Sequence, residues 1–90
     1  MYRPTYDLYI GNLDDNLTEP MLYGAFSQFG PIASVKIMRH IVTRQSRGFG
    51  FVNFLNQHHA QKAIAALNNH KILNNKIKVF SKFKFQQLSK

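Results

Sequence analysis

The sequence contains no cysteine, and it contains no aspartate or glutamate after Glu19. Without cysteine, disulfides, thiolate nucleophiles and cysteine-ligated zinc or iron–sulfur sites are excluded. Paired catalytic carboxylates are excluded everywhere beyond the N-terminal segment. The chain also has no run of about 18 apolar residues, so we expect no transmembrane helix. Residues 1–4 lack the apolar stretch of a secretory signal.

The charge that is present is strongly basic. Twelve Lys and Arg residues stand against four Asp and Glu residues among 90, giving a formal net charge of +8. The hydrophobic content of 44% is typical of one compact domain rather than a disordered tail. A compact basic chain is expected to bind a polyanion, with nucleic acid the first choice and an anionic membrane surface the second.

Hydrophobic periodicity predicts four strands and two helices in the order βαββαβ. We expect strands at residues 7–11, 32–39, 49–54 and 76–80, one helix from Thr18 to Gly30 and another at residues 57–67. Two helices can cover only one face of a four-stranded sheet. The predicted fold is therefore α+β, a two-layer split βαβ (ferredoxin-like) sandwich whose antiparallel sheet carries both helices on one face.

The predicted domain fills most of the chain. Residues 1–6 are interpreted as a lead-in, 7–82 as the domain, and 83–90 as a tail or the start of a linker. Thr18 is the predicted N-cap of the first helix, with Pro20 in its first turn. Leu17 and Leu22 have the spacing of a hydrophobic staple. Residues 68–75 are expected to form a turn-rich connection.

Period-two alternation places aromatic side chains on the sheet face that the helices leave bare. They are Tyr9, Phe49, Phe51 and Phe80, with Lys36, Arg47 and Lys78 around them. Flat rings beside cations suit unstacked nucleic-acid bases, because stacking contributes roughly 1–3 kcal/mol per base while the cations meet phosphates. Gly48 and Gly50 are expected to let both backbone and bases approach without side-chain obstruction.

The residues of two predicted strands resemble a known family. RGFGFVNF (residues 47–54) fits the longer signature of the RNA recognition motif, and LYIGNL (residues 8–13) resembles its shorter signature. The resemblance implies that Tyr9 and Phe51 each stack a base and that Phe49 packs against sugars. It also implies that Arg47 holds a phosphate.

A narrower resemblance covers LTEPMLY (residues 17–23), GPI (30–32) and VTRQSRG (42–48). These segments are similar to the first such motif of cytoplasmic poly(A)-binding proteins. The resemblance implies binding of A-rich messenger RNA in the cytoplasm, with the nucleus as the alternative. It also implies a second motif in the same chain and a translation-initiation scaffold on the helix face. The family commonly has a tryptophan near Phe80 and an acidic residue at the position of His40.

Ten further residues complete the predicted RNA site. The polar and basic candidates, together with one methionine, are Asn12, Lys36, Met38, Arg39, Arg44, Arg47, Asn53, Lys78, Ser81 and Lys82. Backbone groups of Ser81 and Lys82 are expected to read base edges. The alternatives are that the basic side chains are simply solvated and that the aromatic residues pack under the tail or a partner. Phe80 either stacks a base or covers the sheet edge.

Other functions fit the sequence less well. No pair of histidines has the spacing of a helical zinc site, so we expect neither a metal nor a cofactor. An acyl-phosphate hydrolase would need a basic phosphate loop where this chain has Asp14 and Asp15. The chain is therefore expected not to be an enzyme. The open alternatives are an RNA recognition motif of a splicing or U-rich-RNA-binding factor, and a motif with an added protein-interaction role on its helix face.

Overall fold

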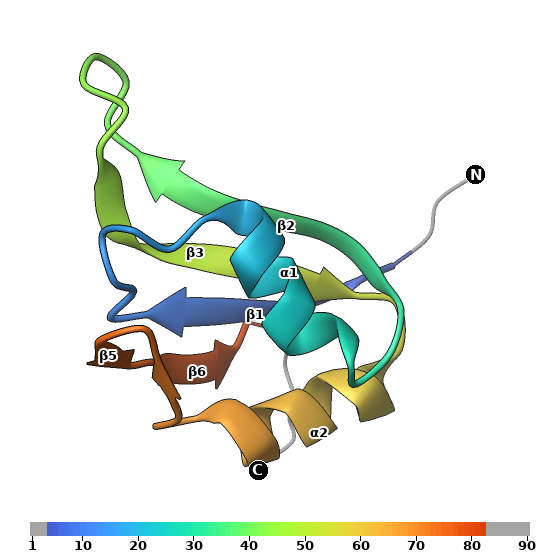
Figure 1. Cartoon of the computed structure of the whole chain (residues 1–90). Helices are drawn as coiled ribbons and strands as arrows, with labels where there is room; N and C mark the ends of the chain where they lie inside the picture. Colours follow the sequence, from blue (N-terminus) through green and yellow to red (C-terminus); the bar gives the residue numbers. More distant parts are fainter. Residues whose placement is uncertain (1–3, 83–90) are drawn as a thin grey trace, which may run out of the picture.

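The computed structural model describes residues 4–82, which form a four-stranded sheet, two helices and a small hairpin. The strands of the sheet are β1 (Tyr6–Gly11), β2 (Ile32–Arg39), β3 (Ser46–Phe54) and β6 (Lys78–Ser81). Their order across the sheet is β2-β3-β1-β6, and every neighbouring pair is antiparallel (Figure 1). The expected lead-in and tail, residues 1–3 and 83–90, lie outside the described residues.

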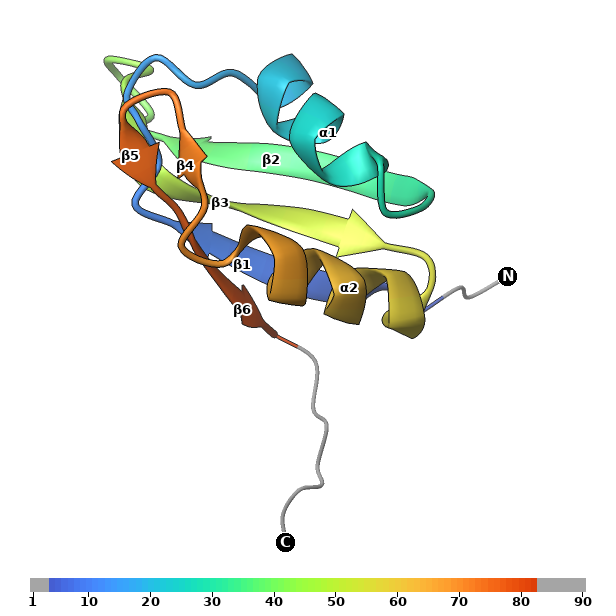
Figure 2. The same ribbon diagram turned by 60° about the horizontal axis from the view of Figure 1, so that its bottom comes forward.

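A two-stranded hairpin lies where the sequence predicted an irregular connection. β4 (Lys71–Ile72) and β5 (Asn75–Lys76) pair with each other, and Figure 2 shows them at one end of the sheet. Ile77 then exchanges backbone hydrogen bonds with Asn69 and His70 of the preceding connection. The predicted start of the last strand at residue 76 was therefore wrong, because residues 76 and 77 pair with the connection rather than with β1.

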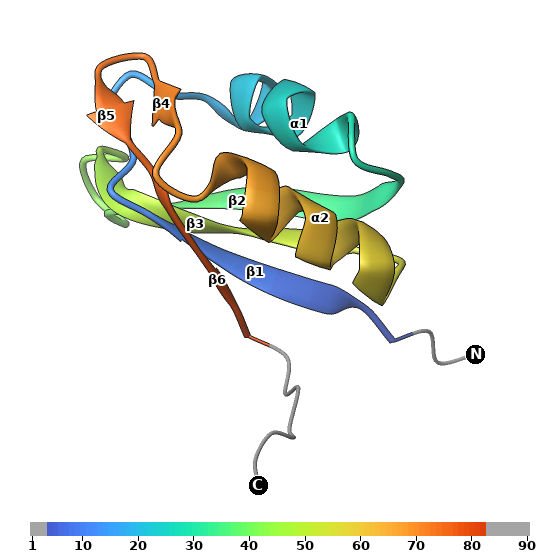
Figure 3. The same ribbon diagram turned by 90° about the horizontal axis from the view of Figure 1, so that it is seen from below.

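Both helices, α1 (Glu19–Ser27) and α2 (Gln57–Leu67), cover the same face of the sheet (Figure 3). The expected fold class is thereby confirmed. The inner face of the sheet meets the helices through fully buried side chains of Leu8, Ile10, Val52, Phe54, Leu22, Phe26, Ala60 and Ala63. Burying a large apolar side chain contributes roughly 1.5–3 kcal/mol. This core therefore stabilises the layer contact and leaves the opposite face of the sheet without helices.

The helix starts follow their capping residues. Thr18 Oγ1 accepts a hydrogen bond from the Met21 N–H at 3.4 Å, and Leu17 and Leu22 are both buried, as the predicted staple requires. At α2, Asn56 Oδ1 accepts from the N–H groups of His58 and His59 at 2.8 and 3.2 Å. These caps fix where each helix begins and therefore which of its faces meets the sheet.

Side chains also fasten the ends of the sheet to its connections. Asn12 Nδ2 donates to the carbonyl of Lys76 at 2.9 Å, which ties the end of β1 to β5. Asp14 accepts from Asn16 and from the turn of the small hairpin at Asn74. Asn68 Oδ1 accepts from the backbone N–H of Val79 at 2.9 Å on β6. The segments around the sheet are thus held by hydrogen bonds as well as by packing.

Candidate nucleic-acid interface

Four aromatic rings lie side by side on the sheet face without helices. We call the rings of Tyr9, Phe49, Phe51 and Phe80 the aromatic face. The centroid of Tyr9 is 5.6 Å from Phe49, 5.8 Å from Phe51 and 6.1 Å from Phe80. The planes of Tyr9 and Phe80 differ by 28°, whereas Phe49 and Phe51 meet edge to face at 89°. Tyr9 is therefore the centre of the cluster.

The strand register brings these rings together. Tyr9 pairs with Phe51 of β3 and with Phe80 of β6, and Phe51 pairs with Lys36 of β2. Since residues directly opposite on antiparallel strands share a face, Lys36, Phe51, Tyr9 and Phe80 form one row across all four strands. Tyr9 and Phe80, which are 71 positions apart in the sequence, thus meet in one row, as alternation had predicted.

Much of this aromatic surface is accessible to solvent. Phe80 is 54% exposed, and Tyr9, Phe49 and Phe51 are each partly exposed. A contiguous aromatic patch on an uncovered sheet face is typical of a binding surface. Its width of four strands can accept several flat ligands, one on each accessible ring.

Two cations lie against these rings. The Arg47 guanidinium carbon is 5.6 Å from the Phe49 centroid, and Lys82 Nζ is 5.2 Å from the Phe51 centroid. Both distances are within the range of cation–π attraction. A base that stacks on Phe51 has to displace the Lys82 ammonium, which then becomes available to a phosphate or to a base edge.

The remaining predicted cations are arranged at the borders of the aromatic face. Lys36 is exposed at the β2 end of the row that contains Tyr9. Lys78, opposite Gly11 in the register, donates from Nζ to Asn69 Oδ1. Arg44 is exposed in the loop between β2 and β3, and Met38 is partly exposed near the end of β2. No carboxylate faces these positions from β2, β3 or β6.

Arg39 does not belong to this surface. Its Nη2 atom lies 2.8 Å from Glu19 Oε1, an ion pair on the helix side of the sheet. The expectation that Arg39 lines the edge of the aromatic face was wrong. Alternation along β2 places Arg39 with the buried Ile37 rather than with Lys36. Among residues 4–82 this is the only ion pair, and it uses one of the predicted RNA-binding cations.

The carboxyl of Glu19 has a pKa below its ordinary value. Partial burial acts to raise this pKa, but the hydrogen bond from Arg39, those from the backbone N–H groups of Glu19 and Ile37, and the charge of Arg39 together outweigh burial. The Ile37 N–H donates to Glu19 Oε2 at 3.2 Å. Glu19 therefore remains ionised and joins the first turn of α1 to β2.

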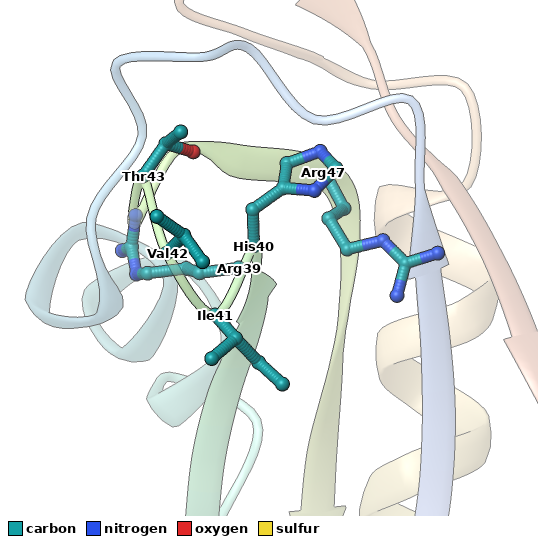
Figure 4. Close-up of a pocket in the computed structure, with 6 residues that line it drawn as sticks. All are labelled: Arg39, His40, Ile41, Val42, Thr43 and Arg47. Atoms are coloured by element: carbon teal, nitrogen blue, oxygen red, sulfur yellow. The ribbon is translucent and has the colours of Figure 1, made fainter.

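A hollow of about 450 Å³ adjoins the aromatic face at the loop between β2 and β3. Figure 4 shows the residues that line it: Arg39, His40, Ile41, Val42, Thr43 and Arg47. Arg39 and Arg47 extend from the base of the loop in different directions (Figure 4). Ile41 and Val42 at the loop tip are each 89% exposed. The aromatic rings themselves lie outside this hollow, on the open surface.

Three further predicted site residues have contacts or positions that the structure defines. The Asn12 side-chain amide donates a hydrogen bond to the backbone carbonyl of Lys76, so this contact stabilises the fold. The backbone N–H of Lys82 donates to the Asp7 carbonyl at 2.7 Å, so it continues the pairing of β1 and β6 and does not face a base. Ser81 lies opposite Leu8, at a register position whose side chains face the helices.

The structure gives a different explanation for each of the two glycines in the longer signature. A Cβ added at Gly50 would lie 2.3 Å from the carbonyl oxygen of Lys36, so Gly50 permits the close approach of β2 and β3. The expected close approach of backbone is thus found at Gly50, between two neighbouring strands. Gly48 has φ +85°, a conformation that favours glycine, and it has open space around it.

One row of polar residues lies next to the aromatic rows. Asn53 of β3 pairs with Ser34 on one side and with Asp7 on the other. Asn53 Oδ1 accepts from Ser34 Oγ at 2.5 Å. The sequence reasoning included Asn53 but missed Asp7, which shares the face of Tyr9 because it is two residues earlier on the same strand. Asp7 was already the first residue of the predicted strand 7–11, so applying the alternation to it would have found this neighbour of Tyr9.

A metal site receives no support from the described part of the chain. No group of three or more His, Asp and Glu residues in 4–82 is arranged to hold a metal ion. No helix in that range is long and apolar enough to cross a membrane. What the geometry offers is a flat aromatic platform with cations at its borders.

Comparison with known proteins agrees with this geometry. Residues 8–78 match the family model described as RNA recognition motif. Over 61 residues the chain is 48% identical to polyadenylate-binding protein 2 of Arabidopsis thaliana, an alignment that takes in 68% of the chain and 10% of that relative. The chain thus spans about a tenth of the length of this curated relative.

Solved structures share the fold closely. The first two domains of the yeast poly(U)-binding protein match with a TM-score of 0.85 and 30% identity, covering 89% of this chain and 48% of that one. A complex of the Sxl-lethal protein with RNA matches with a TM-score of 0.81 and 34% identity, covering 86% and 46%. The aromatic platform, the family model and these relatives agree, and the chain belongs to the RNA recognition motif family of single-stranded RNA-binding domains.

Proposed function

We propose that the aromatic face binds single-stranded RNA with a preference for A-rich sequence, as part of a poly(A)-binding protein. The main observation in support of this RNA-binding surface is the row of rings centred on Tyr9, which no helix covers. Bases stack on the rings, and Lys36, Arg47 and Lys82 neutralise phosphates. The preference for adenine is supported by the 48% identity to a polyadenylate-binding protein.

Titration with single-stranded 8-mers tests the preference. Oligo(A), oligo(U), oligo(C) and a mixed 8-mer are added at one fixed salt concentration, and binding is followed by fluorescence anisotropy. We expect oligo(A) to bind more tightly than oligo(U). Equal affinities would contradict the poly(A) assignment, and a preference for oligo(U) would favour the U-rich-RNA-binding alternative, since the yeast structural relative is a poly(U)-binding protein.

Two alanine variants test the surface itself. The double change Tyr9→Ala and Phe51→Ala removes the central stacking rings and is expected to cost about 2–5 kcal/mol of RNA-binding free energy. Tyr23→Ala is a control, because Tyr23 is an aromatic residue, 50% exposed, that lies on α1 rather than on the sheet. Circular dichroism checks that each variant folds. Unchanged RNA affinity of the double variant would show that RNA binds elsewhere.

The resemblance to poly(A)-binding proteins supports further parts of the proposal. It favours a second RNA recognition motif in the full-length protein and action in the cytoplasm, with the nucleus as the alternative. It also favours a translation-initiation scaffold on the helix face, where Met21 and Tyr23 are exposed on α1. Pull-down of such a scaffold with wild-type protein and with the double variant Met21→Ala, Tyr23→Ala tests this face independently of RNA.

A further inference from the structure

We propose that the carboxylate of Asp7 accepts a hydrogen bond from the exocyclic amino group of a bound base, so that one position of the RNA favours adenine or cytosine over uracil. This inference rests on the proposed function, because it requires RNA on the aromatic face. It assigns a specificity-determining role to an acidic residue that lies outside both signature segments, residues 8–13 and 47–54.

Asp7 is the only acidic residue on the described strands of the sheet. It pairs with Asn53 in the same register in which Tyr9 pairs with Phe51. Because residues two apart on a strand share a face, Asp7 and Tyr9 are neighbours on the open side. The other acids of the chain, Asp14, Asp15 and Glu19, follow β1 and lie in the turn and the first helix.

The carboxylate is oriented by its own strand. Thr5 Oγ1 donates to Asp7 Oδ1 at 2.8 Å, which holds one oxygen and leaves Oδ2 as the acceptor for a ligand. Asp7 takes part in no ion pair within residues 4–82, although the protein has a net charge of +8. A carboxylate that is oriented, partly exposed and not paired with any cation of residues 4–82 is a strong hydrogen-bond acceptor.

Asn53 supplies a donor beside this acceptor. Its Oδ1 accepts from Ser34 Oγ on β2, so its amide nitrogen is directed away from Ser34. Asp7 lies opposite Asn53 on the other neighbouring strand, β1. The row that borders the aromatic face therefore offers one acceptor and one donor, a pattern that suits a base edge.

Charge decides what Asp7 can contact. A carboxylate repels an RNA phosphate, and its two oxygens accept hydrogen bonds without donating one. Adenine and cytosine present an amino donor at N6 and N4, whereas guanine and uracil present a carbonyl acceptor at the corresponding positions. An acceptor-only side chain placed at that position of the base therefore attracts the amino groups of adenine and cytosine and repels the carbonyls of guanine and uracil.

The test is Asp7→Asn, a substitution of nearly the same size whose amide can also donate to a carbonyl. Affinities for oligo(A), oligo(C) and oligo(U) 8-mers are measured at one salt concentration. The A:U and C:U affinity ratios are each expected to fall on the order of tenfold, because one charged hydrogen bond is lost and uracil gains a donor. Asp15→Asn is the matched control, since it makes the same charge change at an exposed position away from the sheet.

The two possible failures can be told apart. If Asp7→Asn raises all three affinities by the same factor as Asp15→Asn, Asp7 acts only through its charge and this inference is overturned, while the proposed function stands. If RNA binding survives the loss of Tyr9 and Phe51, the proposed function itself fails. Thermal unfolding of the Asp7→Asn protein verifies that the compared molecules are folded.

Discussion

Arg39 and Glu19 form an ion pair, with 2.8 Å between Arg39 Nη2 and Glu19 Oε1, that joins the end of β2 to the first turn of α1. Arg47, only eight residues later, lies over the Phe49 ring on the opposite side of the sheet. Two arginines that look alike in the sequence therefore have different partners, and their substitutions should have different effects.

Arg39→Ala and Arg47→Ala make the same charge change and can be compared directly. Arg39→Ala is expected to lower the free energy of unfolding by about 1 kcal/mol or less, since partly exposed ion pairs contribute little. Arg47→Ala is expected to weaken RNA binding for all sequences and to reduce the slope of log K against log salt by about 0.7. Urea unfolding and titrations at several salt concentrations measure both effects. Equal losses of salt slope would place Arg39 in contact with RNA after all.

Stability should fall in acid because two carboxyl groups have lowered pKa values in the folded protein. The Asn16 N–H lowers the pKa of Asp14, burial opposes this, and the side chain and N–H of Asn74 lower it further. The pKa of Glu19 is lowered as described above. A group with a lowered folded pKa binds more protons when unfolded, so its contribution is present at neutral pH and is lost as pH falls below about 5.

Urea unfolding from pH 7 to pH 3 checks this expectation. The double variant Asp14→Asn, Glu19→Gln should be less stable than wild type at pH 7 and should lose less stability on acidification. Parallel curves for the two proteins would show that other groups cause the acid sensitivity. Asp15→Asn is a control, because this exposed carboxylate has none of the hydrogen bonds that hold Asp14.

Gly50→Ala and Gly24→Ala should change stability in opposite directions. A Cβ at Gly50 meets the Lys36 carbonyl at 2.3 Å, and the backbone of two paired strands has to move, so we expect a loss of roughly 1–3 kcal/mol or more. A Cβ added at Gly24, within α1, would have open space around it, so alanine should stabilise by about 0.5–1 kcal/mol. Thermal unfolding measures both, and a tolerated Gly50→Ala would contradict the close approach of β2 and β3.

Period-two alternation predicted most of the sheet correctly. It placed Tyr9, Phe49, Phe51 and Phe80 on one face because each lies in a regular strand whose other face is apolar. The same rule, applied one step further, puts Arg39 with Ile37 and Asp7 with Tyr9. Arg39 was misassigned and Asp7 was missed, although both stand in predicted strands, because the alternation was not followed to the ends of those strands.

Other features depend on contacts that are distant in the sequence. β4 and β5 are too short for periodicity to show, and their turn is held by Asp14, 60 residues earlier. The partner of Arg39 is 20 residues away on a helix. Position 50 requires glycine because the Lys36 carbonyl on β2 lies so close to it, and no pattern within residues 47–54 reveals this contact. The local sequence pattern thus identified which side chains share a face of the sheet. Tertiary contacts decide which polar groups remain available to bind RNA.

The hydrogen bond from Val79 to Asn68 has a consequence for association between molecules. β6 is an edge of the sheet, and the free N–H groups of an edge strand are where another chain can add by backbone pairing. Asn68 already occupies the Val79 N–H with a side-chain oxygen. A second copy or an extended peptide that continues the sheet beyond β6 must first break this bond, so Asn68 protects the domain against edge-to-edge aggregation.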